Sequence, residues 1–274
     1  MNANFFVFTR GRTGSTAIID ELGKHPDIST LQELFIQLEK APRLMDAYRK
    51  YGKDFYRHIE SQYLFPPFDV WSRQYVKMGK FYFVGFIPYS VGRLIGRYLQ
   101  LAEQRIVGGE RSFGFKVLSN HFDEWPSLCK HLFKRNYRVI YLERTNAVRQ
   151  VISGMVANQR GAYNRKNFQP DSRSFVLPLD EFGMLVKWEL KMVKQEKQRL
   201  RERGFDVLEV TYEQFLEDRA AFFERICAFL GVPYVLPGRT EYSVMIQDLR
   251  KTIANYDELE ERVRAMGMEK FLAS

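Results

Sequence analysis

The chain has 274 residues and a formal net charge of +9, and 45% of its residues are hydrophobic. This length allows one large domain or two small ones with a sizeable core, and the composition excludes a largely disordered protein. No apolar run approaches the roughly 20 residues that a membrane-spanning helix needs. The positive charge favours an anionic ligand, which includes nucleotides, nucleic acids, acidic sugars and membrane surfaces.

The sequence predicts a cytoplasmic protein. The apolar run from Phe5 to Phe8 is too short for the core of a signal peptide. Two cysteines, Cys129 and Cys227, give neither a disulfide framework nor the spacing of metal ligands. Buried thiols of this kind are typical of a reducing compartment.

Four short apolar runs predict buried strands. They cover Phe5–Thr9, Phe113–Leu118, Tyr137–Leu142 and Val207–Thr211. Helical patterns follow at least three of them, and strands that alternate with helices predict an α/β fold with a mainly parallel central sheet between two layers of helices. Ligands of such sheets bind where the carboxyl ends of the strands converge.

No internal repeat or linker divides the sequence, which predicts one domain over the whole chain. Residues 40–112 are rich in aromatic side chains and mainly helical in pattern, and residues 158–183 indicate a long loop. Residues 187–204 predict a helix with a solvated basic face and with Trp188, Leu190 or Met192 turned inward. This interpretation is preferred to a surface that binds nucleic acid.

A glycine loop, "TRGRTGST", follows the first predicted strand. Gly11 and Gly14 allow the backbone to turn tightly and to approach a ligand. The amides of residues 13–16 then point to one spot at the start of a helix, which Ser15 or Thr16 is expected to cap. Arg12 can bind two oxygens of the same anion. The pattern therefore predicts an anion site, although a plain structural turn has similar glycines.

This loop differs from the P-loop of nucleotide triphosphatases, G-x-x-x-x-G-K-[ST]. Gly11 and Gly14 are too close together, and Ser15 stands where that pattern has its lysine. No aspartate ends a predicted strand in the way that a magnesium ligand would. A magnesium-dependent kinase is therefore poorly supported.

A second anion site is predicted after the strand Tyr137–Leu142. Arg144 lies at the end of that strand, and Ser153 lies nine residues later in the next helix. On this helix Arg149 and Ser153 are four residues apart and share a face. Taken alone, Ser153 fits two interpretations equally well, which are a ligand-binding hydroxyl and a small residue at a contact between helices. Together with Arg144 it predicts a site for a second phosphate.

The order of these motifs resembles that of the sulfotransferases that use 3′-phosphoadenosine-5′-phosphosulfate (PAPS). In this family the first loop binds the 5′-phosphosulfate, and the later Arg and Ser bind the 3′-phosphate. The resemblance extends to "TYEQFLEDRAAFFERICAFLGVP" and "IANYDEL" and leaves residues 40–112 without a recognisable motif. It implies a P-loop-like three-layer fold. The PAPS-binding residues that it implies are Arg12, Thr13, Gly14, Ser15, Thr16, Arg144 and Ser153.

Within this family the chain is more similar to bacterial and carbohydrate-type members, such as those that modify nodulation factors, glycolipids or trehalose. The segments that carry this similarity are "RTGST", "QELF" and "ANQRGAY". The chain lacks the "RKGxxGDWK" segment of the cytosolic small-molecule enzymes. Whether Arg250 and Lys251 replace that segment is left open by the sequence.

The chemistry implied by the resemblance is in-line transfer of a sulfuryl group to a hydroxyl, which depends on positioning and charge. Arg12 and the loop amides are expected to stabilise charge on the leaving phosphate, and no metal is expected because a sulfuryl group carries less charge than a phosphoryl group. Lys116 is expected to contact the sulfuryl oxygens, or else to cover the end of its strand. The general base is Glu33 or His121. The resemblance to carbohydrate-type members favours Glu33, and the different spacing of His121 from that of cytosolic members weakens its case.

Two other functions are consistent with parts of the sequence. One is a metal-dependent nucleotide phosphotransferase, and the other is a non-enzymatic polyanion-binding domain whose affinity falls steeply with salt. Two separate anion motifs at strand ends argue against the second. The expected partners are a nucleotide donor and a hydroxylated acceptor, not nucleic acid. The basic surface permits contact with a membrane if the acceptor is a glycolipid, and the sequence predicts neither the acceptor nor the oligomeric state.

Overall fold

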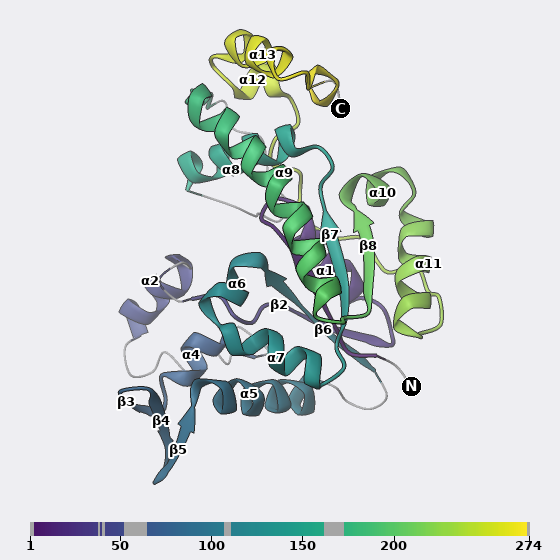
Figure 1. The fold of residues 1–274 in the computed structure, drawn as a ribbon. Helices are drawn as coiled ribbons and strands as arrows, with labels where there is room; N and C mark the ends of the chain where they lie inside the picture. The colour runs from purple at the N-terminus through teal and green to yellow at the C-terminus, as the bar shows by residue number, and fades with distance from the viewer. Residues whose placement is uncertain are drawn as a thin grey trace.

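A five-stranded parallel sheet lies at the centre of the protein (Figure 1). The computed structural model describes residues 3–37, 39, 42–51, 65–106, 111–161 and 173–272. The strand order is β2-β6-β1-β7-β8, and all four neighbouring pairs are parallel. The strands are β1 (Phe5–Thr9), β2 (Ile28–Glu33), β6 (Ser112–Leu118), β7 (Arg138–Glu143) and β8 (Val207–Thr211). The predicted α/β fold with a mainly parallel sheet is confirmed.

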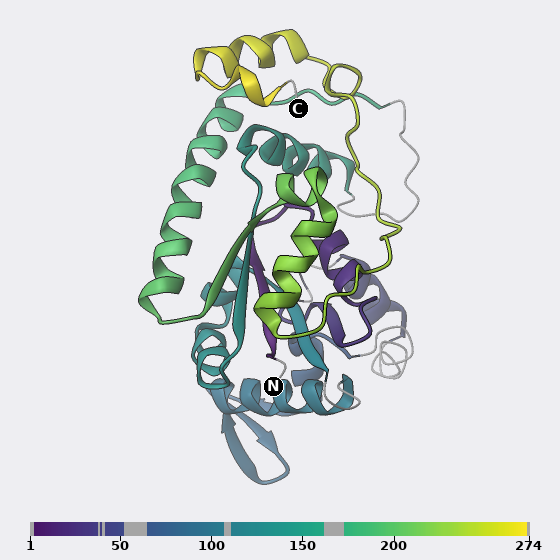
Figure 2. The same ribbon diagram turned by 90° about the vertical axis from the view of Figure 1, so that its right-hand side faces the viewer.

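Helices cover both faces of this sheet (Figure 2). All five residues of β1 are buried, because the strand lies in the middle of the sheet. Phe5 and Val7 pack on one face with α1 (Ser15–Leu22) and α11 (Arg219–Leu230). Phe6 and Phe8 pack on the other face with α5 (Val91–Ile106), α7 (Pro126–Lys134) and the end of α9 (Leu179–Glu202). The remaining helices around the sheet are α6 (Ser119–Glu124) and α10 (Tyr212–Glu217).

A third apolar cluster lies beyond the end of β7, at the top of Figure 1. It consists of α8 (Ala147–Arg160), the first half of α9 (Leu179–Glu202), α12 (Leu249–Thr252) and α13 (Tyr256–Ala265), followed by a short 3-10 helix, Glu269–Phe271. The continuous helix α9 connects this cluster with the sheet. None of the helices in the described part of the chain has both the length and the apolar character that crossing a bilayer requires.

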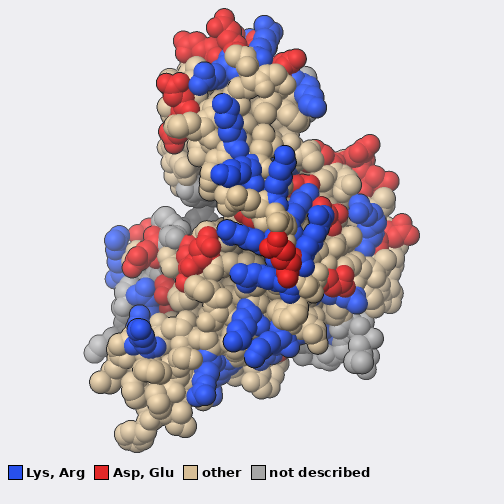
Figure 3. All heavy atoms as spheres, in the orientation of Figure 1, with Lys and Arg blue, Asp and Glu red and all other residues tan. Residues whose placement is uncertain are grey.

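Helix α9 carries the basic segment that the sequence predicts to be helical. Figure 3 shows a band of Lys and Arg side chains along it, as expected for a solvated basic face. The expected inward position is wrong for Trp188 and Leu190, which are exposed, whereas Met192 is partly buried. The residues that α9 buries include two glutamates, Glu189 and Glu196, whose carboxylates are paired with Arg10, the residue that follows β1.

The segment expected to be mainly helical, residues 40–112, also contains a small antiparallel sheet that the sequence pattern did not predict. The helices of this segment are α2 (Pro42–Tyr51), α4 (Phe68–Ser72) and α5. The strands of the small sheet are β3 (Val76–Met78), β4 (Phe81–Val84) and β5 (Ile87–Ser90). Residues 40–41, 52–64 and 107–110 lie outside the described residues. The loop predicted over 158–183 is shorter in the structure, because α8 continues to Arg160 and α9 begins at Leu179, and its residues 162–172 are also outside the described part.

Candidate active site

The glycine loop joins β1 to α1 at the carboxyl edge of the sheet. Gly14 is the N-cap of α1 and has a φ of 75°, so Ser15 and Thr16 lie inside the helix and do not cap it as expected. A Cβ atom on Gly14 would overlap the ring of Tyr212. A Cβ atom on Gly11 would have no neighbouring atom within 4 Å. The shape of the loop therefore requires glycine at position 14 and not at position 11.

Two threonines attach the loop to the sheet. Thr9 donates to the carbonyl of Leu142 on β7 (2.8 Å), and its hydroxyl lies 2.6 Å from that of Thr13. Thr13 also donates to the carbonyl of Arg10 (3.2 Å) and is buried. Because the Thr13 hydroxyl is engaged inside the loop, Thr13 can offer an anion its backbone amide, together with the other amides of the loop and of the first turn of α1.

The two predicted anion motifs lie against each other. Arg12, which has a left-handed φ of 68°, donates from Nε to the Ser153 hydroxyl on α8 (3.0 Å). Arg144 donates from Nη1 to the backbone carbonyl of Arg12 (3.4 Å). The structure thus brings together the glycine loop and a strand end that is 132 residues away in the sequence.

Two half-buried arginines beside this contact each have a buried donor without a partner in the described part of the chain. Arg144 Nε and Arg149 Nε are buried and have no hydrogen-bond partner among the described residues. Burial lowers the pKa of both side chains, and the positive charge of Arg149 lowers the pKa of Arg144 further. The Arg144 guanidinium lies 5.2 Å from the centre of the Tyr212 ring. Since buried donors without acceptors are costly, an anion bound here would stabilise both groups.

A second group of polar residues lies where β2 and β6 end. The ammonium of Lys116 is 2.6 Å from Oε1 of Glu33 and donates to the Thr16 hydroxyl in the first turn of α1 (3.0 Å). Burial by itself raises the pKa of Glu33, but the charge of Lys116 and its hydrogen bond lower it below its ordinary value. Glu33 is therefore ionised at neutral pH.

His121 is the third residue of α6 and is only 1% exposed. Its Nδ1 accepts a hydrogen bond from the backbone N–H of Leu118 (3.2 Å). The side chain of Glu33 is 20% exposed. Both candidate bases thus lie in one group, and Glu33 is the more accessible of the two.

A buried ionic network, which the sequence analysis did not identify, contacts the glycine loop at Arg10 and at the Gly11 carbonyl. Arg10 Nε is 2.6 Å from Glu189 Oε1, and Arg10 also pairs with Glu196. Gln150 donates from Nε2 to Glu189 Oε1 (2.8 Å) and to the carbonyl of Gly11 (2.9 Å). The network therefore connects α8 and α9 to the loop. A seven-residue spacing places Glu189 and Glu196 on one helix face, which is the signal that could have indicated them.

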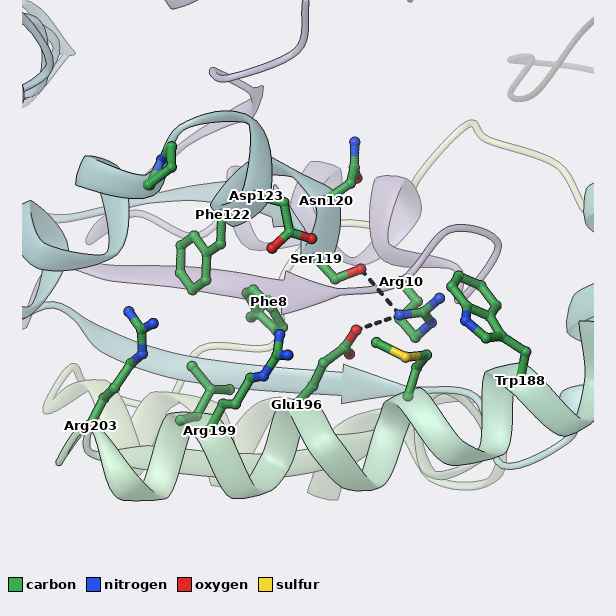
Figure 4. A pocket seen from close by; sticks show the side chains of 13 residues that line it. Phe8, Arg10, Ser119, Asn120, Phe122, Asp123, Trp188, Glu196, Arg199 and Arg203 are labelled. Atoms are coloured by element: carbon green, nitrogen blue, oxygen red, sulfur yellow. Dashed lines mark hydrogen bonds and ion pairs between the residues drawn. The ribbon is translucent and has the colours of Figure 1, made fainter. Parts of the chain in front are cut away.

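A cavity of about 450 Å³ adjoins this network (Figure 4). It lies between α6 and α9, where the Arg10 guanidinium stacks at 4.4 Å on the Trp188 ring and contacts Ser119. Its apolar wall includes Phe8 and Phe122. The described residues that line it do not include Glu33, Lys116 or His121, so the cavity is separate from that group.

Arg250 and Lys251 lie on α12. Arg250 pairs with Asp257 and Glu260 of α13, both at 3.0 Å, and is largely exposed. Lys251 is also exposed and lies 3.8 Å from Asp248. The contacts of Arg250 therefore connect α12 with α13.

Residues 4–235 match the sequence profile described as "Sulfotransferase family". A comparison with curated protein sequences found no match. Among solved structures, the fold is similar to the sulfotransferase domain from the curacin biosynthetic pathway (12% identity, 86% of this chain and 76% of that chain, TM-score 0.51). It is also similar to the sulfotransferase domain of the Synechococcus PCC 7002 olefin synthase (18% identity, 85% and 74%, TM-score 0.50). A sulfotransferase from Alicyclobacillus acidocaldarius matches at 18% identity over 100% of this chain and 96% of that chain, with a TM-score of 0.45.

Proposed function

The chain belongs to the sulfotransferase family and is a sulfuryl-transferring enzyme, and we propose that it uses PAPS as the donor and a hydroxyl of a carbohydrate, a glycolipid or a small alcohol as the acceptor. The observation that carries the choice of donor is the contact between the two anion motifs, in which Arg12 meets Ser153 and Arg144 meets the Arg12 backbone. A single nucleotide with phosphate at both its 5′ and 3′ positions can bind to both motifs.

The residues present fit this nucleotide. The loop amides and Arg12 would hold the 5′-phosphosulfate at the start of α1. Arg144, with its buried unsatisfied Nε, and Ser153 would hold the 3′-phosphate, and the unsatisfied Nε of Arg149 lies on the same helix as Ser153. The ring of Tyr212 lies between the two sites, packed against Gly14 and close to Arg144, and thereby fixes their spacing.

We assign the role of general base to Glu33. Its lowered pKa keeps the carboxylate ionised at neutral pH, and its partial exposure gives it access to an acceptor. Glu33 would accept the hydroxyl proton while the bond between the acceptor oxygen and sulfur forms and the bond between sulfur and the phosphate oxygen breaks. His121, which is buried and accepts a hydrogen bond from the Leu118 N–H, would have a structural role beside Glu33.

Positive charge for the transfer would come from side chains. Lys116 is bonded to Thr16 at the start of α1, so its ammonium is held beside the loop that would bind the sulfuryl oxygens. Arg12 would stabilise the charge that develops on the leaving phosphate. With these two cations in place we propose a reaction without a metal. We also propose a cytoplasmic location, which the two buried free cysteines support.

The test is incubation of the purified protein with PAPS and a panel of hydroxylated acceptors, with mass spectrometry to detect a product that has gained one sulfuryl group. Glu33→Gln should abolish turnover and leave binding of adenosine 3′,5′-bisphosphate nearly unchanged, whereas His121→Asn should retain most of the turnover. The opposite result would move the base to His121. Phosphoryl transfer from ATP with magnesium, and no transfer from PAPS, would favour the phosphotransferase. Salt-sensitive binding of any polyanion without nucleotide selectivity would favour the polyanion-binding domain.

A further inference from the structure

The small sheet formed by β3, β4 and β5 projects from the lower end of the molecule (Figure 1). Its antiparallel register pairs Tyr82 with Lys77 on one side and with Tyr89 on the other. Tyr82 is buried in the core cluster below the main sheet, and Tyr89 and Val84 pack against that cluster. These contacts identify the inner face of the small sheet and attach it to the core.

The outer face of this sheet is apolar and exposed. Because side chains alternate along a strand, Val76, Met78, Phe81 and Phe83 point away from the core. Met78 is 63% exposed, and Val76 and Phe81 are exposed as well. At the turn between β4 and β5, Phe86 is 100% exposed. Exposed apolar surface that is continuous over several residues marks a site of interaction.

This apolar surface lies in a segment with positive and no negative charge. Between Asp69 and Glu103 the sequence has no acidic residue. The same segment contains five exposed cations, which are Arg73, Lys77, Lys80, Arg93 and Arg97. Arg73 pairs with Asp69 at its border. Figure 3 shows no acidic side chain on the visible part of the tip formed by β4 and β5.

We propose that the β3–β5 sheet docks onto an anionic lipid bilayer. Phe86 and Ile87 at the turn would enter the boundary between headgroups and acyl chains, and Lys80, which lies exposed in the turn between β3 and β4, would contact lipid phosphates while its alkyl stem lies on apolar surface. Negative headgroups complement the charge of this segment. A second copy of the chain would instead bring two acid-free cationic surfaces together, which their repulsion opposes. The proposal does not depend on the identity of the donor or the acceptor.

Sedimentation of the full chain with lipid vesicles tests the proposal. The protein should bind vesicles that contain phosphatidylglycerol, and added salt or pure phosphatidylcholine vesicles should weaken binding. The double variant Met78→Ser/Phe86→Ser should lose about tenfold or more in partitioning. The control Met184→Ser/Leu216→Ser replaces two apolar side chains of α9 and α10 that are 66% and 62% exposed. This control should bind vesicles like the wild type.

Lys80→Gln should weaken binding to phosphatidylglycerol by about fivefold. Absence of binding to any vesicle would overturn the proposal, and so would equal losses in the control and the apolar variant. The proposal would also be overturned if the protein does not bind vesicles and instead forms a dimer that the Met78→Ser/Phe86→Ser substitutions dissociate. That result would assign the face to a second copy of the chain. Circular dichroism of each variant verifies that a loss of binding is not a loss of folding.

Discussion

Gly14→Ala tests whether the glycine loop has the shape that the site requires. Alanine at a φ of 75° costs about 1–2 kcal/mol, and forcing its Cβ past the Tyr212 ring adds about 1–3 kcal/mol of overpacking. We therefore expect the free energy of unfolding to fall by about 2–5 kcal/mol in urea titrations. Affinity for adenosine 3′,5′-bisphosphate should fall as well, because the substitution displaces both the loop amides and the ring between the two anion sites.

Gly11→Ala is the matched control in the same loop. Its Cβ would meet no atom within 4 Å, so its unfolding free energy should stay within about 0.5 kcal/mol of the wild type. Tyr212→Ala combined with Gly14→Ala should be less destabilising than the sum of the single variants by about 1–3 kcal/mol, because the overlap is removed. Equal stabilities of the Gly11 and Gly14 variants would refute this account of the loop.

Other predictions concern the residues around the loop. Lys116→Met removes the cation that lowers the pKa of Glu33, so the acidic limb of the pH profile of kcat/KM should move to higher pH. An unchanged limb would show that Lys116 does not set the pKa of the general base. Because the lowered pKa of Glu33 stabilises the fold above its unfolded pKa and this contribution disappears as pH falls, Lys116→Met should cost more stability at pH 7 than at pH 3. Glu189→Gln weakens the network that holds Arg10 and the Gly11 carbonyl, so calorimetry should show a loss of about 1–3 kcal/mol in stability and weaker bisphosphate binding, while Glu202→Gln on the exposed face should change neither. Ser153→Ala should weaken bisphosphate affinity by about 2–10-fold in the same assay.

The strands of the central sheet were predictable where both faces are buried. β1 and β8 have the predicted bounds, β6 begins one residue earlier than predicted, and β7 is shifted by one residue at both ends. Their continuous apolar runs reflect burial under helices on both sides. β2, with the sequence "ISTLQE", was missed because it is an edge strand in which only Ile28 is fully buried. The strand that carries Glu33 therefore has no strong apolar signal.

The parts of the candidate site that follow strand ends were also predictable, because the carboxyl ends of parallel strands meet at one edge. Arg12, Arg144 and Ser153 lie together for this reason. Glu189 and Gln150 were not identified, since their role depends on side-chain contacts between α8, α9 and the loop that hydrophobic periodicity does not encode. Tyr212 begins α10 directly after β8, and its packing on Gly14 is likewise visible only in three dimensions.

The central claim is that one nucleotide spans the glycine loop and the Arg144 site. Isothermal titration of the wild type and of Arg144→Ala with adenosine 3′,5′-bisphosphate and with adenosine 5′-monophosphate tests it most directly. A charge-assisted contact contributes about 1.5–3 kcal/mol, so Arg144→Ala should weaken binding of the bisphosphate by about 10–150-fold. Binding of the monophosphate should stay nearly unchanged. Equal losses for the two nucleotides, or none for either, would contradict the claim.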